Sequence, residues 1–201
     1  MTVFNSATPR GGTTHVSPDE ERFLKISVSS LEELNQHERE NILEARNWLF
    51  ALRRKLTVDQ LLDPLFVRDL HHRMFRHIWK WSGKFRDCEL NIGVEPAQVQ
   101  QHYFSLRADV KAWVEFGTFP PDEICIRFHH SLVVVHPWRN GNGRHARLIA
   151  DRLAVAFGNP AFTWGGGAAL EAKSNTRDLY LTAMKQADKR DFKLLMAFAR
   201  D

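Results

Sequence analysis

The chain has 201 residues, 43% of them hydrophobic, and its 28 Lys and Arg against 24 Asp and Glu give a net charge of +4. This length predicts one domain of ordinary size. The mild basic balance does not by itself indicate nucleic-acid binding, and we expect no nucleic-acid partner. The sequence shows no signal-peptide pattern and no apolar run of about 18 residues, so we expect a cytoplasmic protein without a membrane span. Cys88 and Cys125 form no metal or redox motif, and both are expected to be free thiols.

Residues 1–27, rich in proline, glycine and small polar residues, are predicted to form a flexible N-terminal arm. Residues 28–56 are predicted to form one helix, because apolar residues recur at spacings of three and four. Ser30 with Glu33 and Asn35 with Glu38 both have the spacing of a capping box. We favour the later start at Asn35.

Residues 57–201 are predicted to form the main domain. The sequence Thr57-Val58-Asp59-Gln60 is a capping box for a short helix, and Asp63-Pro64 opens the next helix. That helix should pass Ile78 and end near Ser82 and Gly83. It carries several basic residues that we interpret as a solvated or partly buried face and not as a metal-ligand set: His71, His72, Arg73, Arg76 and His77.

Residues 84–95 alternate in part between apolar and polar and contain Gly93, which favours an extended hairpin. Helices are then expected from Val99 to Trp113, from a cap at Asp122 to His136, from Ala146 to Phe157, from a cap at Asn175 to Ala187, and from Phe192 to Phe198. The predicted fold class is therefore all-α, a bundle of seven or eight helices with one short β-hairpin.

The stretch from His136 to Arg147, HPWRNGNGRHAR, links two of these helices. Pro137 disfavours helical dihedrals in the residue before it. Gly141 and Gly143 allow the backbone to turn so that successive N–H groups form a phosphate nest, a concave anion site. Arg144 and Arg147 lie in the first turn of the second helix, where their charge opposes the helix dipole. A bound polyphosphate would relieve this conflict.

His136 titrates near neutral pH and stands at the rim of the nest. A base beside a phosphate site indicates group transfer from a nucleotide. Asn142 is expected to shape the nest or to contact phosphate. His129 and His130 are interpreted as packing or supporting residues, and His145 as a surface residue.

The same stretch resembles the signature of the Fic family, His-x-Phe-x-(Asp/Glu)-Gly-Asn-(Gly/Lys)-Arg-x-x-Arg. The match covers His136, Gly141, Asn142, Gly143, Arg144 and Arg147, with Trp138 at the aromatic position. The family uses this aromatic residue for packing, so the resemblance implies that Trp138 is a core anchor and not a base-stacking platform. Asn140 stands where the family has an acidic metal ligand. Together with Thr163-Trp164-Gly165 and the N-terminal helix, it makes the chain most similar to the subgroup called mobile mystery protein B.

The resemblance implies a protein adenylyltransferase that moves AMP from ATP to a Ser, Thr or Tyr hydroxyl of a target protein. His136 would be the general base, and Gly141, Asn142, Gly143, Arg144 and Arg147 would bind the nucleotide. Asn140 would face Mg²⁺ or Mn²⁺ through a neutral carbonyl oxygen. The expected hairpin would be a flap that holds an extended target segment through Glu89, Leu90, Asn91 and Ile92.

Many Fic proteins carry an inhibitory helix with the pattern (Ser/Thr)-x-x-x-Glu-(Gly/Asn), and here the nearest match is Gln36 to Asn41, with Gln36 in place of the hydroxyl residue. The corresponding hypothesis is that Glu40 pairs with Arg147 and competes with the γ-phosphate. The alternative is a solvated helix face.

Two other functions compete with an active transferase. The Asn140 substitution supports a catalytically weak nucleotide-binding regulator or partner-binding module. A histidine-metal hydrolase would use His71, His72, His129, His130 and His136, but these residues lack a carboxylate or cysteine set at ligand spacing. The sequence leaves the oligomeric state open.

Overall fold

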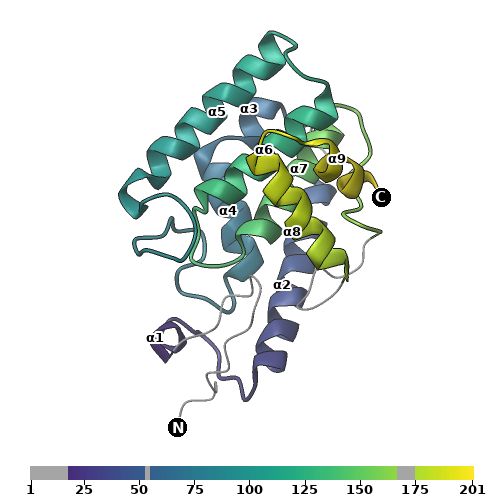
Figure 1. Cartoon of the computed structure of the whole chain (residues 1–201). Helices are drawn as coiled ribbons and strands as arrows, with labels where there is room; N and C mark the ends of the chain where they lie inside the picture. The colour runs from purple at the N-terminus through teal and green to yellow at the C-terminus, as the bar shows by residue number, and fades with distance from the viewer. Residues whose placement is uncertain (1–17, 53–54, 167–174) are drawn as a thin grey trace. The chain divides into compact units, whose positions relative to one another are not determined.

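The computed structural model describes residues 18–52, 55–166 and 175–201. Within these ranges the regular structure is helical, and the expectation of an all-α fold is confirmed (Figure 1). The helices in chain order are α1 (Pro18–Glu21), α2 (Leu31–Ala51), α3 (Val58–Leu61), α4 (Pro64–Phe75), the 3-10 turn η1 (Pro96–Gln98), α5 (Val99–Glu115), α6 (Pro121–Val135), α7 (Asn142–Ala156), α8 (Asn175–Asp188) and α9 (Lys193–Arg200). Of the predicted N-terminal arm, residues 1–17 lie outside the described residues.

The chain divides into two compact units. The first unit comprises Met1–Arg54 and Pro64–Lys84, and the second comprises Lys55–Asp63 and Phe85–Asp201. The stretch from His136 to Arg147 therefore lies wholly within the second unit.

In the first unit, α2 packs against α4. The predicted start at Asn35 is wrong, because Ser30 is the N-cap of α2 and its hydroxyl accepts a hydrogen bond from the Glu33 amide at 3.1 Å. Glu38 interrupts the apolar face of α2, yet only 3% of its surface is exposed. Its carboxylate accepts a 2.7 Å hydrogen bond from Trp79 Nε1, which satisfies this buried acid.

The predicted extension of the next helix to Ile78 and on to Gly83 is also wrong, since α4 ends at Phe75. Residues 78–80 instead pair with residues 23–25, through a 2.8 Å bond from Lys25 N to Ile78 O and a 2.9 Å bond from Lys80 N to Phe23 O. On α4, His71 is fully buried, and its Nδ1 accepts from the amide of Gly83 at 3.0 Å. This histidine has a structural role in the first unit.

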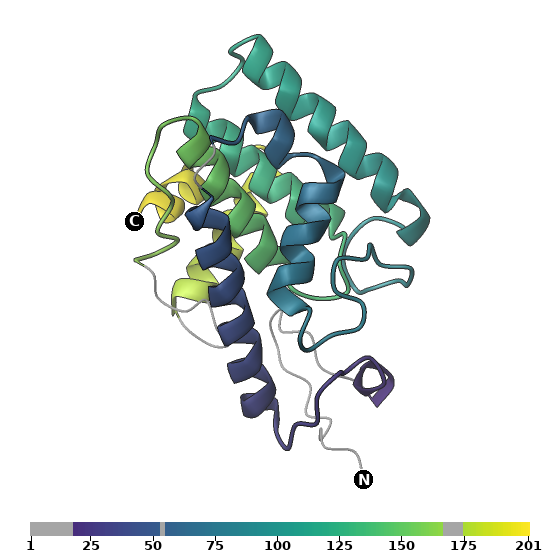
Figure 2. The same cartoon turned by 180° about the vertical axis from the view of Figure 1, so that it is seen from behind.

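In the second unit, α6 and α7 lie side by side (Figures 1 and 2). Helix α5 packs on α6, α8 packs on α9, and α3 contacts α7. The predicted capping box of α3 is confirmed, with hydrogen bonds of 3.2 and 3.0 Å between Thr57 and Gln60. The packing of α6 on α7 buries several large side chains, among them Phe128, Leu132, Ile149 and Leu153. It also fixes the loop between these two helices.

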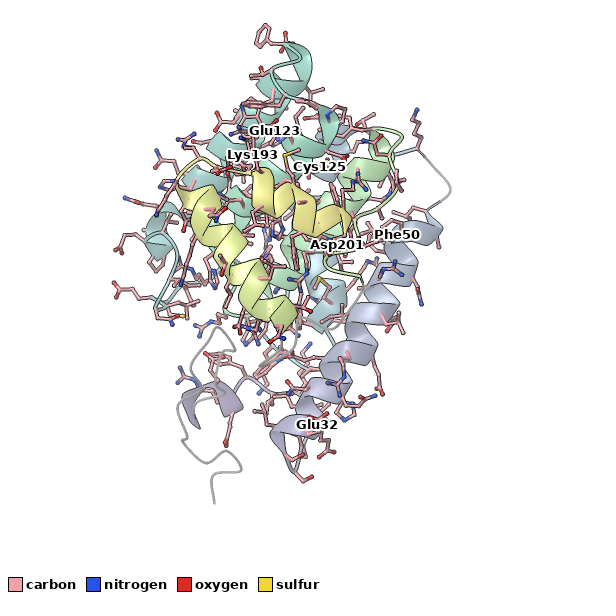
Figure 3. All side chains as sticks on the ribbon, turned by 45° about the vertical axis from the view of Figure 1, so that its right-hand side comes forward. Glu32, Phe50, Glu123, Cys125, Lys193 and Asp201 are labelled. Atoms are coloured by element: carbon pink, nitrogen blue, oxygen red, sulfur yellow. The ribbon has the colours of Figure 1, made fainter. Side chains whose placement is uncertain are left out.

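The predicted cap of α6 at Asp122 is wrong, because Pro120 is the N-cap and makes no side-chain capping bond. The Asp122 carboxylate binds other partners: Arg200 Nη2 at 2.5 Å, Arg200 Nε at 2.7 Å and Asn159 Nδ2 at 2.7 Å. Figure 3 labels Glu123 and Cys125 near the start of α6, and Lys193 and Asp201 at the two ends of α9. The Asp122–Arg200 pair thus ties the start of α6 to the last residue of α9.

The predicted β-hairpin over residues 84–95 is wrong, because none of these residues is in a strand. This segment is bonded instead to the end of α6 and to the loop that follows it, by Val94 N to Val135 O at 3.4 Å and Arg86 N to Pro137 O at 2.9 Å. These main-chain groups face the neighbouring loop, so a two-stranded ladder within the segment does not form.

Candidate active site

His136 is the residue that ends α6, and it has a left-handed backbone conformation with φ 53° and ψ 59°. Residues other than glycine pay about 1–2 kcal/mol for this conformation. Pro137 disfavours a right-handed helical conformation at His136, and the His136 amide still donates to Leu132 O at 3.1 Å. A strained backbone at a helix end is often found at functional sites.

The imidazole of His136 is fixed by its own helix. Nδ1 lies 3.2 Å from the carbonyl oxygen of Val133, and a carbonyl can only accept, so Nδ1 carries the proton and Nε2 carries the lone pair. Burial lowers the pKa of His136 to about 4, and the positive charge of Arg86 also lowers it, against the effect of the Val133 bond. The ring is therefore neutral at pH 7, with Nε2 as a proton acceptor.

The turn before α7 depends on two asparagines. Asn140 Oδ1 accepts from the Gly141 amide at 2.6 Å and from Arg144 Nη2 at 3.3 Å. Asn142 is 4% exposed and binds both main-chain groups of Trp138, with Oδ1 accepting from its N–H at 2.9 Å and Nδ2 donating to its carbonyl at 2.8 Å. Asn142 thus fixes the shape of the loop, one of its two expected roles.

Gly141 is the N-cap of α7, with φ 79° and no side-chain capping bond. Gly143 is already helical, so the expectation that both glycines form the turn is wrong for Gly143. The N–H groups of a helix's first turn have no carbonyl partner within the helix. With the dipole of α7, these N–H groups make the start of the helix a candidate anion site, and phosphate binding there stays a prediction.

Arg144 lies in the first turn of α7, but Arg147, the sixth residue of the helix, lies in the second turn, so the expectation that both belong to the first turn is wrong for Arg147. The guanidinium of Arg147 lies 5.6 Å from the ring centroid of Tyr180 on α8. Burial lowers the pKa of Arg147, and Tyr180 opposes this shift through its charge and its hydrogen bond. Tyr180, which no sequence pattern marked, therefore orients Arg147, one of the two arginines predicted to bind phosphate.

Two other histidines are buried near this site. His129 is fully buried, as predicted for a packing residue, and contacts Trp164 and Tyr180. His145 was expected at the surface, but it is fully buried and its Nδ1 accepts from Trp138 Nε1 at 3.2 Å. The expectation for His145 is wrong because Trp138 turns into the core, as predicted, and its indole N–H requires a partner there.

Arg86, like Tyr180, is a residue near the candidate site that sequence reasoning missed. Only 4% of its surface is exposed, and its guanidinium donates to three main-chain carbonyls: His136 O at 2.6 Å, Cys88 O at 3.0 Å and Val94 O. The residue lies in a segment without helical or strand periodicity, so no pattern marked it. Of the four residues predicted to bind a target, Glu89, Asn91 and Ile92 are exposed and Leu90 is partly buried.

A divalent cation does not fit Asn140 as the structure has it. Its side-chain oxygen already accepts two hydrogen bonds, and one of the donors is the cation Arg144. Among the described residues, no group of three or more His, Cys, Asp or Glu could hold a metal ion. Glu40, the hypothetical inhibitory residue, belongs to the first unit, where its carboxylate accepts from Gln36 Nε2 at 2.8 Å.

Residues 61–154 match the model of the Fic/DOC family, a range that includes α6, the loop and most of α7. The chain contains a Fic/DOC family domain. The subgroup suggested by the sequence stays a prediction.

Two relatives with Fic names show the extent of the similarity. The protein adenylyltransferase fic-1 of Caenorhabditis briggsae is 29% identical over 82 residues, which cover 39% of this chain and 16% of the nematode protein. The probable protein adenylyltransferase Fic of Escherichia coli K12 is 24% identical over 147 residues, covering 66% of this chain and 70% of that protein. This chain thus spans only a small part of the nematode relative.

The fold also resembles solved Fic structures. BepC, an effector of Bartonella tribocorum solved with bound AMPPNP, superimposes with a TM-score of 0.65 and 16% identity. The match covers 89% of this chain and 90% of the BepC chain. At this identity the likeness establishes the Fic fold.

Proposed function

We propose that this protein is an adenylyltransferase that moves AMP from ATP to a Ser, Thr or Tyr hydroxyl of a target protein. The observation that carries the proposal is the state of His136, a neutral imidazole whose Nε2 can accept a proton. This residue stands at the start of the loop that leads into α7 and its proposed anion site. The names of the nematode and bacterial relatives and the AMPPNP bound to BepC support the same reaction.

In the proposed reaction, His136 Nε2 removes the proton from the target hydroxyl as its oxygen attacks the α-phosphorus of ATP. The new bond joins this oxygen to the α-phosphorus, and the bond from the α-phosphorus to the bridging oxygen breaks. Pyrophosphate leaves with the bonding electron pair. The first-turn N–H groups of α7 and the side chains of Arg144 and Arg147 neutralise the charge on the phosphates.

We assign target binding to residues 89–92, with exposed Glu89, Asn91 and Ile92 in contact with an extended segment of the target. The segment is not a hairpin here, but main-chain groups of an irregular loop can also pair with an extended peptide.

Among the residues that the structure describes, none of the helices combines the length and the apolar character that a membrane span needs.

Asn140 is the residue that we propose lies nearest to a Mg²⁺ or Mn²⁺ ion brought in by the nucleotide. Its oxygen would have to give up the bond to Arg144 first. This conflict favours the second candidate function, a weakly active nucleotide-binding regulator. Asn140→Asp adds a carboxylate and should tighten Mn²⁺ binding measured by calorimetry with ADP present, whereas an unchanged affinity would remove Asn140 from the metal site.

The decisive experiment compares the wild-type chain with His136→Ala for transfer of labelled AMP in a cell lysate and for ATP binding by calorimetry. We expect ATP binding by both proteins and transfer by the wild type alone, because loss of a general base costs about 10²–10⁴ in rate. Equal transfer by both proteins would refute the role of His136. Binding by both without transfer by the wild type would establish the regulator.

A further inference from the structure

The side chain of Arg86 bridges the two ends of the loop that residues 88–94 form. Its guanidinium donates to Cys88 O at 3.0 Å and to Val94 O, the carbonyls at the two ends of this loop. One rigid guanidinium therefore fixes both ends of the loop, and the residues between these ends are exposed apart from Leu90, which is partly buried.

The same guanidinium also binds the residue that carries the base. Arg86 Nε donates to His136 O at 2.6 Å, and the Arg86 amide donates to Pro137 O at 2.9 Å. The carbonyl of His136 belongs to a residue in an unfavourable left-handed conformation, so a charged donor on it counters the strain. Three parts of the chain thus meet at one side chain: the start of the loop, its end and the main chain of His136.

Gly93 shows how closely the loop is packed at this point. A Cβ atom built on Gly93 would lie 2.7 Å from Arg86 Nη2 and 2.7 Å from the Cβ of His136. Its φ of 108° is also unfavourable for a residue with a side chain. Glycine at this position lets the loop rest directly on the arginine and the histidine.

Burial of Arg86 has a cost that its bonds must offset. Desolvation lowers the pKa of this guanidinium, which is 4% exposed. Hydrogen bonds that involve a charged group contribute about 1.5–3 kcal/mol each, but only if the acceptors stay in place. Loss of the guanidinium would leave the carbonyls of Cys88, Val94 and His136 without this donor.

We propose that Arg86 is a positioning residue. Its guanidinium holds the 88–94 loop at a fixed position relative to the main chain of His136, so that a hydroxyl of a target bound to the loop lies next to His136 Nε2. This inference rests on the proposed function and deepens it. Arg86 itself touches neither ATP nor the reacting atoms. Its effect should therefore appear in kcat and in the order of the loop, and not in the affinity for ATP.

The first test compares Arg86→Gln and Arg86→Lys with Arg127→Gln. Arg127 is a suitable control because it lies on α6 in the same unit, stacked on Phe119 and Phe192 and paired with Glu123, away from His136. We expect kcat of both Arg86 variants to fall about 10²-fold, the cost of a small misplacement of reacting groups, with an unchanged Kd for ATP. Lysine keeps the charge but cannot reach three separate carbonyls with one nitrogen, so Arg86→Lys should fold without recovering kcat.

The second test leaves Arg86 in place. Gly93→Ala inserts a methyl group into the contact, and Gly158→Ala is its matched control, because Gly158 also has a positive φ of 90° but no atom within 4 Å of the position that its new methyl group would take. Both variants place a side chain on a residue with positive φ, so both should lose stability for this reason. Only Gly93→Ala should also lower kcat and speed hydrogen exchange of the Val94 amide, which donates to Val135 O.

The two proposals can fail separately. If the wild type transfers no AMP, hydrogen exchange at Val94 and the NMR signal of the His136 ring still test Arg86, and both should change in the Arg86 and Gly93 variants alone. The positioning role would be overturned if the Arg86 and Gly93 variants matched the Arg127 and Gly158 controls in kcat, in hydrogen exchange of the Val94 amide and in the NMR signal of the His136 ring.

Discussion

The hydroxyl of Tyr180 lies 3.0 Å from Nε2 of His129, an imidazole that is completely buried. Burial, helped by the positive charge of the nearby Arg147, lowers the pKa of His129 to about 3, so the ring is neutral at pH 7. A neutral His129 can accept the phenolic proton, which leaves the oxygen of Tyr180 as an acceptor for Arg147. A histidine and a tyrosine from two helices thereby orient Arg147, an arginine of the proposed phosphate site.

Tyr180→Phe tests this arrangement. The variant keeps the aromatic ring next to Arg147 but removes the oxygen that orients the guanidinium, and it leaves His129 without its partner. We expect unfolding free energy to drop by about 1–2 kcal/mol. Calorimetry should also show a loss of affinity for ATP of about three- to tenfold that is much smaller for AMP, which lacks the γ-phosphate. Equal losses for ATP and AMP would contradict a role in γ-phosphate binding.

The pH dependence of transfer should report the buried state of His136. A base whose pKa is lowered to about 4 is deprotonated throughout the neutral range. The rate should therefore stay flat from pH 8 down to about pH 5 and decline only below, instead of halving near 6.5 as for a solvent-exposed histidine. Initial rates of transfer between pH 4 and pH 8, in buffers of constant ionic strength, measure this dependence. A half-maximal rate near pH 6.5 would place His136 in water.

Stability should fall on mild acidification. His129 and His136 bind protons near pH 6.5 when unfolded but only near pH 3 and 4 when folded, so the unfolded state binds more protons in between. Their contribution is complete above pH 6.5 and is lost as the pH falls below it. By pH 5 the loss from His129 should reach about 2 kcal/mol, with a smaller share from the partly exposed His136.

Urea unfolding at several pH values measures this loss. His129→Gln cannot titrate, and its amide can still accept a hydrogen bond from Tyr180. The slope of stability against pH between 6.5 and 5 should be shallower in this variant than in the wild type. The same slope in both proteins would show that His129 is not the proton-linked group.

The hypothesis of self-inhibition makes a prediction about α2. If Glu40 competes with the γ-phosphate for Arg147, Glu40→Gly should raise adenylylation, most visibly as self-modification. Glu44→Gly is the matched control one turn later, where the carboxylate accepts from Arg76 Nη2 at 2.8 Å in its own unit. Autoradiography of the purified variants with labelled ATP gives the comparison. A rise with Glu44→Gly alone would shift the register by one turn, and no rise with either would make α2 structural.

Sequence reasoning found the features of the fold and site that local patterns encode. The apolar spacing of α6 and α7, the proline after His136 and the glycine that caps α7 each act through neighbouring residues, and each is visible in the chain. Thr57 and Gln60 likewise bond across three residues. Local chemistry decides such features, so the sequence suffices to predict them.

The predictions that were wrong or missing concern residues whose partners lie far away in the sequence. Arg86 acts on the carbonyl of His136, fifty positions away, and Tyr180 acts on His129 across 51 positions. Residues 84–95 had a plausible hairpin pattern, yet their main-chain groups bond to the end of α6 and to the loop that follows it. Asp122 had the position of a cap, but the guanidinium of Arg200, 78 residues later, is the stronger partner. Spacing along the chain carries no signal for such pairs.

The two Asn-Gly pairs at the start of α7, one before the helix and one inside it, differ in how readily they will deamidate. In this dipeptide the glycine nitrogen can attack the side-chain amide, because no Cβ hinders it, and hydrolysis of the resulting ring releases aspartate or isoaspartate. Asn142 is buried, helical and held by both of its amide atoms, which opposes this reaction. Asn140 precedes the helix and is partly exposed, so deamidation should act first there. A stored sample would slowly acquire a carboxylate beside Arg144, and fresh and aged preparations of one chain would then differ in their response to divalent cations.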